Sequence, residues 1–489
     1  MTRPARPARR RLRLLLLLGG CFLWQAAAVP HLAAEAATAG PLPQAAAASA
    51  GDAAGAANAT SAAPGPESRW PMFLGLQYTF IDQQQTALLS PYQSHLSLLP
   101  AGDRQSTNTI GAYGGWAPVP WGQLYLDVEK FMGAGVSGAT GIGGLTNGDV
   151  VREGTQGLKK EFYIARLYAR FMLPLGSATT AVARGQDQIP GTEAARRLEL
   201  KVGVLSVTDD FDKNRYAGST RTEFMNWSLW ANTAFDYAAD TRGYTDGFVL
   251  AYVSPAWSLR YGMYRMPLVA NGQTLETLAR AREQDLELTL SPPSVSTIVR
   301  LLAYSNVGNM GDYEEALAIA AAAGAIPDIA ADNQPGRRKV GFGVNLEQPL
   351  ADSGDSGIFA RLGWNDGQTE DFVFTEVDRV VSFGGQLSGV HWRRSDDRLG
   401  LAAVVEGISG PHRDYLAAGG MGFLLGDGRL NYGYEQIVEA YYKAQWSWSI
   451  AHSPLRLALT PDFQYMQNPG YNRDRGPVRF YALRVHLEY

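Results

Sequence analysis

Alternation of apolar and polar residues, repeated from about residue 70 to the end, constrains this chain more than any other feature. In the closing segment VRFYALRVHLEY, residues 478–489, every second residue from Tyr481 reads Tyr, Leu, Val, Leu, Tyr. The residues of the other set read Phe, Ala, Arg, His, Glu. Successive side chains of a strand point to opposite faces, so this segment predicts a strand with one apolar and one polar face. The apolar face would pack on a core in a soluble sheet, and would meet lipid in an outer-membrane barrel.

Comparable runs recur along the chain and give the number of expected strands. They begin near residues 72, 110, 121, 161, 197, 247, 256, 284, 296, 339, 357, 381, 399, 436, 455 and 478. An even number of about 16 strands is typical of a bacterial single-chain barrel. The sequence therefore predicts an all-β fold, a transmembrane antiparallel β-barrel of about 16 strands, with short helices in its loops.

A soluble protein of two antiparallel β domains would explain the alternation equally well. It would give no reason for the aromatic end of the chain or for an export signal joined to so many strands. Aromatic residues also recur near predicted strand ends, as expected for the girdles at the two membrane interfaces. Examples are Tyr441, Tyr442, Trp446, Trp448 and Tyr489.

The N-terminus predicts export. Six arginines precede an apolar segment at residues 14–29, and two A-x-A patterns follow, of which Ala34-Glu35-Ala36 is favoured as the cleavage site. We expect a signal peptide at 1–36, an Ala/Gly/Pro-rich disordered linker at 37–69 and the barrel at 70–489. The rival interpretation is a lipoprotein attached through Cys21, against which the apolar run continues past the cysteine.

Charge and cysteine content exclude several functions. Removal of residues 1–36 takes Lys+Arg from 43 to 37 and Asp+Glu from 47 to 46, which leaves a net charge of 37 − 46 = −9. An acidic chain argues against a nucleic-acid partner. Cys21 is the only cysteine and lies inside the predicted signal, so disulfides, thiolate metal sites and thiol catalysis are not expected.

Two segments do not alternate and predict short helices in long loops, which would cap the barrel mouth or fold into it. Asp312 precedes an Ala-rich stretch that Gly324 and Pro327 would end. The second segment is EFMNWSLWANTAFDY, residues 223–237.

The sequence contains no spacing of residues that indicates a catalytic, metal-binding or cofactor-binding site more strongly than chance would. The six histidines are scattered without ligand spacing. Ser409, His412 and Asp414 lie close in sequence, but a catalytic triad is defined by geometry, so a polar loop is favoured. The glycine-rich stretch at 419–428 lacks the Lys-Ser/Thr of a phosphate-binding loop and predicts turns.

Charged residues on the predicted inward faces are the candidate pore residues. On the lipid face near the midplane, an arginine would cost about 2–4 kcal/mol, which favours positions in the lumen. A lumen with both signs suits neutral polyhydroxylated solutes, whereas an ion-selective pore would show one dominant sign. The candidates are Asp127, Glu129, Arg166, Arg170, Arg260, Glu347, Arg361, Glu439 and Arg484.

Long, ordered motifs resemble the carbohydrate-selective porin family known as OprB. They include FDYAADTRGYTDGFVLAY (235–252), RYGMYRMPLVANG (260–272), RKVGFGVNLEQPLA (338–351), FARLGWNDGQTEDFVFTEVDR (359–379) and GLAAVVEGISGPHRDYLAAGGMGFLLGDGRLNYGYEQIVEAYY (400–442). YEEALAIA (313–320) and LALTPDFQYMQNPGYN (457–472) also fit. The similarity spans about residues 70–489. The residues on matching motifs are Asp240, Arg242, Asn271, Trp364, Asn365, Asp366, Glu435, Glu439 and Asn468.

The resemblance implies an outer-membrane barrel through which monosaccharides or small oligosaccharides diffuse into the periplasm without energy input. It implies that Arg242, Arg260 and Glu439 reach the pore. Outer-membrane lipid and the barrel assembly machinery are the other expected partners, and the aromatic C-terminal residue resembles the signal that this machinery recognises. The alternatives are an enzyme built on a barrel, and a structural anchor tied through residues 37–68.

Overall fold

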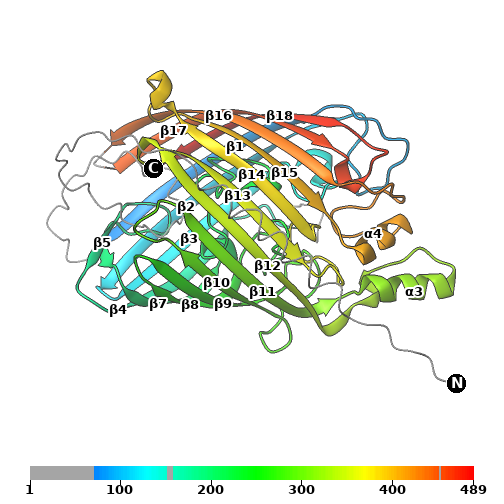
Figure 1. Cartoon of the computed structure of the whole chain (residues 1–489), viewed down its shortest axis with the longest axis horizontal. Coiled ribbons are helices and arrows are strands. Elements are labelled where there is room, and N and C mark those ends of the chain that lie inside the picture. The colour runs from blue at the N-terminus through cyan, green and yellow to red at the C-terminus, as the bar shows by residue number, and fades with distance from the viewer. Residues whose placement is uncertain (1–70, 151–157, 451–452) are drawn as a thin grey trace, which may run out of the picture. The chain divides into compact units, whose positions relative to one another are not determined.

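The computed structural model describes residues 71–150, 158–450 and 453–489. Within them, 16 antiparallel strands close into one barrel (Figure 1). The barrel strands are β1 (Met72–Gln85), β2 (Asp103–Val119), β3 (Gly122–Gly133), β4 (Tyr163–Pro174), β7 (Arg197–Leu205), β8 (Thr245–Val253), β9 (Trp257–Arg265), β10 (Arg282–Leu290), β11 (Ile298–Met310), β12 (Gln334–Ala351), β13 (Ser356–Asn365), β14 (Arg379–Ser388), β15 (Arg398–Gly407), β16 (Glu435–Ile450), β17 (Ser453–Gln467) and β18 (Val478–Glu488).

Each predicted run corresponds to one of these strands, so the predicted fold class and strand number are confirmed. A separate hairpin, β5 (Thr179–Val182) with β6 (Gly191–Ala194), lies between β4 and β7. The predicted signal peptide, the linker and the competing lipoprotein attachment fall outside the described residues.

The first and last strands close the ring. β1 pairs antiparallel with β18, with Phe80 opposite Val485 and Thr79 opposite His486. Leu76 and Tyr489 exchange two backbone hydrogen bonds of 2.9 Å. Closure leaves no open sheet edge, which is the condition for strands to cross a lipid bilayer.

The two faces of the strands differ in polarity as the alternation predicted. Leu74 on β1 is 67% exposed and Leu483 on β18 is 42% exposed on the outer surface. Arg484 and His486, the neighbours of Leu483 and Leu487, are buried inside the barrel. Apolar side chains therefore cover the outside and charged ones the inside, the reverse of a soluble β domain, so the soluble alternative is wrong.

The two ends of the barrel also differ. At one end most connections are short, as between β2 and β3 or between β8 and β9, apart from the one that holds the β5–β6 hairpin, and large aromatic side chains lie on the outer surface. Trp121, Trp257 and Trp448 are 56%, 41% and 50% exposed there. Short turns face the periplasm and longer loops the exterior in barrels of this kind, so these tryptophans form the periplasmic girdle.

The two longest helices of the described residues lie at the long-loop end, where Figure 1 shows α3 (Tyr313–Ala323) beside α4 (Gly410–Ala417). Asp312 caps α3 by accepting from the N–H groups of Glu314 and Glu315 at 3.0 Å, and Gly324 ends it in the left-handed conformation at φ 63°. This helix is confirmed as predicted. None of the helices in the described parts of the chain is long and apolar enough to cross a membrane.

The second predicted helix, at 223–237, is mostly wrong. Only α2 (Trp227–Trp230) is helical, capped by Asn226. The rest of the segment is extended or turned, because its backbone groups bond to side chains of the barrel wall. The remaining elements are short 3-10 helices, η2 (Val136–Gly138), η3 (Val207–Asp209), η4 (Ala330–Asp332), η5 (Asp352–Gly354), η6 (Gly389–Trp392) and η7 (Pro469–Tyr471).

The orientation of the two faces can be tested with Leu401→Arg, in the middle of β15, where the side chain is 61% exposed. We expect the free energy of unfolding in lipid vesicles to fall by about 2–4 kcal/mol, because the guanidinium would meet the hydrocarbon midplane. Ser395→Arg, in the exposed turn before β15, is the matched control and should change it little. Equal losses in both variants would contradict the assignment.

Candidate functional site

The connection between β7 and β8, residues 206–244, folds into the barrel and is named the inner loop. Its backbone is held by charged side chains on distant strands. Glu439 on β16 accepts from the N–H groups of Met225 at 2.5 Å and Asn226 at 2.9 Å. Arg484 on β18 donates to the carbonyls of Thr220 at 2.5 Å and Glu223 at 2.8 Å.

Two further wall residues fasten other parts of the inner loop. Arg361 on β13 donates to the carbonyls of Leu229 at 3.0 Å and Ala217 at 2.7 Å, and pairs with Asp212 at 3.0 Å. Lys339 on β12 pairs with Asp236 at 3.0 Å. The bonds of Arg361 to the two carbonyls satisfy backbone groups that would otherwise be buried without partners, and the two ion pairs fix acidic side chains of the loop to the wall.

The connection that follows β3 packs against the inner loop. Trp227 N–H donates to the carbonyl of Leu145 at 2.8 Å, and Gly143 N–H donates to Glu435 at 3.2 Å. At Gly148 the fit is close, since a Cβ there would lie 2.5 Å from the indole nitrogen of Trp230. Two loops thus narrow the lumen together and leave a defined space.

That space is a cavity of about 390 Å³ that runs along the lumen. Near the long-loop end it is lined by Phe131 and Tyr163, at the end of β3 and the start of β4. Near the short-turn end it is lined by Ile298, Arg456 and Glu488. The cavity therefore extends between the two ends of the barrel.

Charged groups of both signs face the cavity and several are paired. Arg221 of the inner loop bonds Glu129 at 2.8 Å and Asp149 at 3.0 Å. Arg166 bonds Asp209 at 2.6 Å. The charged lining residues are Glu129, Asp149, Asp209, Asp212, Glu223, Glu347, Glu488, Arg166, Lys213, Arg215, Arg221, Arg242, Arg300, Lys443 and Arg456.

These pairs keep the inner-loop groups ionised. Burial alone would lower the pKa of Arg221, but the attraction of Asp149 and Glu129 raises that pKa well above its usual value. Burial would raise the pKa of Asp209, yet the guanidinium of Arg166 outweighs it and holds the pKa below its usual value. The lining therefore has fixed positive and negative groups at neutral pH.

Aromatic side chains form the apolar part of the lining. Trp227 stacks on Phe374 with ring centroids 4.7 Å apart, and Trp230 lies 4.9 Å from Trp227. Phe374 belongs to the connection between β13 and β14, so two loops build this group together. The indole N–H of Trp230 has no hydrogen-bond partner among the described residues.

The structure divides the candidate pore residues into three groups. The cavity is lined by Glu129, Arg166, Arg242 and Glu347. The residues that hold the inner loop by its backbone are Arg361, Glu439 and Arg484. Three candidates do not line the cavity and bond to neighbouring side chains, which for the first of them is the lining residue Arg166: Asp127, Arg170 and Arg260.

Among the cavity-lining candidates, Arg242 lies over the ring of Tyr163, 4.8 Å from its centroid. Glu347 pairs with Arg300 at 3.2 Å and accepts from the backbone N–H of Arg215 at 3.0 Å. Charged groups of both signs therefore lie at the surface of the cavity.

Several lining residues were missed by sequence reasoning, notably Trp227, Trp230, Phe374 and Arg221. They lie on loops, where no strand period indicates the direction of a side chain. The one available signal was the pair of tryptophans three residues apart in a long segment without alternation.

The polar stretch around His412 is α4 rather than a polar loop. Ser409 caps the helix by accepting from His412 N–H at 3.1 Å and donates to the carbonyl of Gly367 at 2.6 Å. Asp414 pairs with Arg413, and Asp378 is the carboxylate beside His412. The Ser409 hydroxyl thus bonds to two backbone groups. Ser409, His412 and Asp414 do not form a triad.

A closed 16-stranded barrel with an apolar exterior, an aromatic girdle and a charged lumen narrowed by loops defines an outer-membrane channel. The sequence-family model described as "Carbohydrate-selective porin, OprB family" matches residues 122–489. The chain therefore belongs to this family. It is therefore a carbohydrate-selective porin of the Gram-negative outer membrane. No curated protein matches the chain.

Solved structures are similar to this chain, and the first of them shares its fold. OprB of Pseudomonas putida, determined at high pH, is 13% identical with a TM-score of 0.62, over 86% of this chain and 94% of that chain. The channel DcaP of Acinetobacter baumannii is 9% identical with a TM-score of 0.45, over 86% and 97%. OmpT of Vibrio cholerae, folded in vitro, is 10% identical with a TM-score of 0.42, over 87% and 99%.

The inner loop can be released by Glu439→Ala. The N–H groups of Met225 and Asn226 would lose their acceptor, at a cost of about 1–3 kcal/mol for each buried group. We expect a larger and noisier single-channel conductance in planar bilayers, because the loop would no longer hold its position in the lumen.

The control is Arg260→Ala, a half-buried wall residue that bonds Ser258 on its own strand at 2.8 Å. It should leave the conductance close to that of the unmodified protein. Unchanged conductance in Glu439→Ala would contradict the anchoring role.

Proposed function

We propose that small neutral sugars diffuse passively through the lumen cavity into the periplasm and are selected by the groups that line it. The observation that carries the proposal is the cavity itself, which reaches from Tyr163 near the long loops to Glu488 near the short turns. A passage along the barrel axis is what diffusion between the exterior and the periplasm requires.

The lining matches the chemistry of a sugar. Arg, Lys and carboxylate groups can replace the water that hydrates sugar hydroxyls, and each good hydrogen bond to a charged group contributes about 1.5–3 kcal/mol. Trp230, which is partly exposed and backed by the buried pair Trp227 and Phe374, would offer an apolar surface for the C–H groups of the ring. Since both charge signs are present, the lining favours a neutral solute over an ion of either sign.

Membership of a porin family supports a channel rather than an enzyme, and we propose that the chain has no catalytic role. The anchor hypothesis, in which residues 37–68 tie the barrel to another structure, is the weaker candidate because the lumen has a continuous lined cavity.

The proposal includes two partners beyond the sugar. Exposed apolar residues such as Leu401 and Leu483 would contact outer-membrane lipid. The last strand, which Tyr489 follows directly, would be the segment that the barrel assembly machinery recognises. Residues 1–36 would direct export, and residues 37–69 would link the signal to the barrel.

Sugar binding in the cavity can be measured as block of ion conductance in planar bilayers. We expect Trp230→Ala to raise the glucose concentration for half-block by about 2- to 10-fold, since one aromatic contact contributes about 0.5–1.5 kcal/mol. Trp448→Ala, on the lipid side, is the control and should leave the block unchanged. If glucose blocks neither variant nor the unmodified protein, sugar selection by this cavity is refuted.

The charge balance of the lumen can be tested by Glu129→Gln. This change removes one carboxylate from the cavity lining and leaves Arg221 with Asp149 alone. We expect the reversal potential in a KCl gradient to shift toward chloride selectivity, because the lining becomes more positive. Asp396→Asn, in the turn before β15, should produce no shift, and an equal shift there would contradict the assignment.

A further inference from the structure

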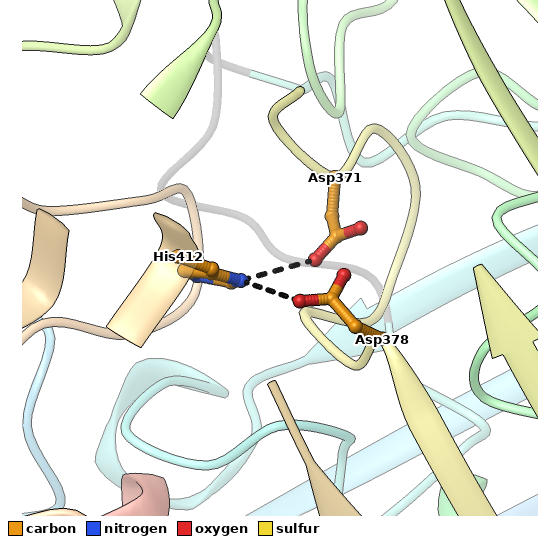
Figure 2. Close-up of side chains that lie close together, drawn as sticks. All are labelled: Asp371, Asp378 and His412. Atoms are coloured by element: carbon orange, nitrogen blue, oxygen red, sulfur yellow. Dashed lines mark hydrogen bonds and ion pairs between the residues drawn. The ribbon is translucent and has the colours of Figure 1, made fainter. Parts of the chain in front are cut away.

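A cluster of three buried side chains lies at the long-loop end of the barrel, apart from the sugar cavity. Asp371 and Asp378 come from the connection between β13 and β14, and His412 comes from α4. Figure 2 shows the imidazole pointing toward both carboxylates. His412 Nδ1 lies 3.3 Å from Asp378 Oδ2 and 3.9 Å from Asp371 Oδ2, and one ligand atom of each residue lies within 4.8 Å of the others.

The cluster has an excess of negative charge. Asp371 and Asp236 both pair with the ammonium group of Lys339. Asp378 is a third carboxylate beside them, and all four of these side chains are at most 2% exposed. With His412 neutral, as a metal ligand must be, Lys339 supplies one positive charge against three carboxylates, and an uncompensated buried charge is strongly destabilising.

One unused carboxylate oxygen points to what completes the cluster. Within the described residues, Asp371 Oδ2 is buried and has no hydrogen-bond partner, whereas Asp378 Oδ2, the other oxygen near the imidazole, accepts from Ser409 N–H at 2.6 Å. Asp371 Oδ2 is the atom that faces the imidazole, whereas Lys339 contacts the other oxygen of the same carboxylate. An unpartnered carboxylate oxygen that faces a histidine nitrogen in a dry site is a ready metal ligand.

We propose that Asp371, Asp378 and His412 bind one divalent transition-metal cation of the zinc or manganese type. Imidazole nitrogen together with carboxylate oxygen is a ligand set that such cations accept, at about 2.0–2.2 Å for zinc. A cation between the three ligand atoms needs only small movements, because they already surround a common point. Its two positive charges, with Lys339, would balance the three carboxylates.

The cation would connect the loops at the outer end of the barrel to the segment that lines the cavity. Asp371 and Asp378 enclose the segment that contains Phe374, and Phe374 stacks on Trp227 in the cavity lining. His412 lies on α4, where its ring stacks on Tyr313 of α3 with centroids 4.4 Å apart. Metal binding would therefore tie the segment that presents Phe374 to the two helices at the outer end.

The purified full-length protein is folded in detergent in the presence of a chelator, and the chelator is then removed. The test is a titration of this metal-free protein with Co²⁺ alone. We expect visible d–d absorption that saturates at one equivalent per chain and disappears when Zn²⁺ is added. His412→Gln and Asp371→Asn should abolish the absorption. Asp414→Asn changes an exposed carboxylate on the same helix and should leave it intact.

Thermal unfolding gives a second readout that needs no variant. Zn²⁺ should raise the unfolding temperature of the unmodified protein, and the shift should be absent from His412→Gln if that variant folds. Absence of both cobalt absorption and bound zinc in a correctly folded unmodified barrel would overturn the proposal. Neither measurement uses sugar block, so failure of the metal site and failure of the sugar channel are distinguishable.

Discussion

Backbone hydrogen bonding between neighbouring strands is the constraint on which this structure depends. A strand in hydrocarbon has no water to satisfy its N–H and C=O groups, so each strand needs a partner on both sides. The bonds between Leu76 and Tyr489 complete that requirement by joining the first strand to the last. Once the ring is closed, one face of every strand meets lipid and the other meets the lumen, which explains the alternation along the sequence.

The charged interior follows from a second requirement of the same kind. The inner loop buries backbone groups against the barrel wall, and those groups need partners as much as the strands do. Glu439, Arg361 and Arg484 supply them at distances of 2.5–3.1 Å. Inward-facing charges in this barrel therefore occupy two kinds of position, since some hold the inner loop and others, such as Glu129, line the cavity.

The sequence predicted the strands and α3 because both depend on local signals. A period of two marks each strand, and Asp312 and Gly324 mark the ends of the helix. The cavity lining was predicted only in part, because its groups meet through the fold. Trp227 and Phe374 are far apart in sequence, and His412 faces Asp378 rather than the nearby Asp414. Strand periodicity indicates that a charge points inward, but not whether a loop carbonyl or open space lies opposite.

The anchors of the inner loop also impose an order on assembly. The loop follows β7, yet its partners Arg361, Glu439 and Arg484 lie on β13, β16 and β18, which appear later in the chain. The loop cannot make all of these contacts before β18 is in place. The strand that closes the barrel therefore also completes the set of bonds that hold the loop inside it.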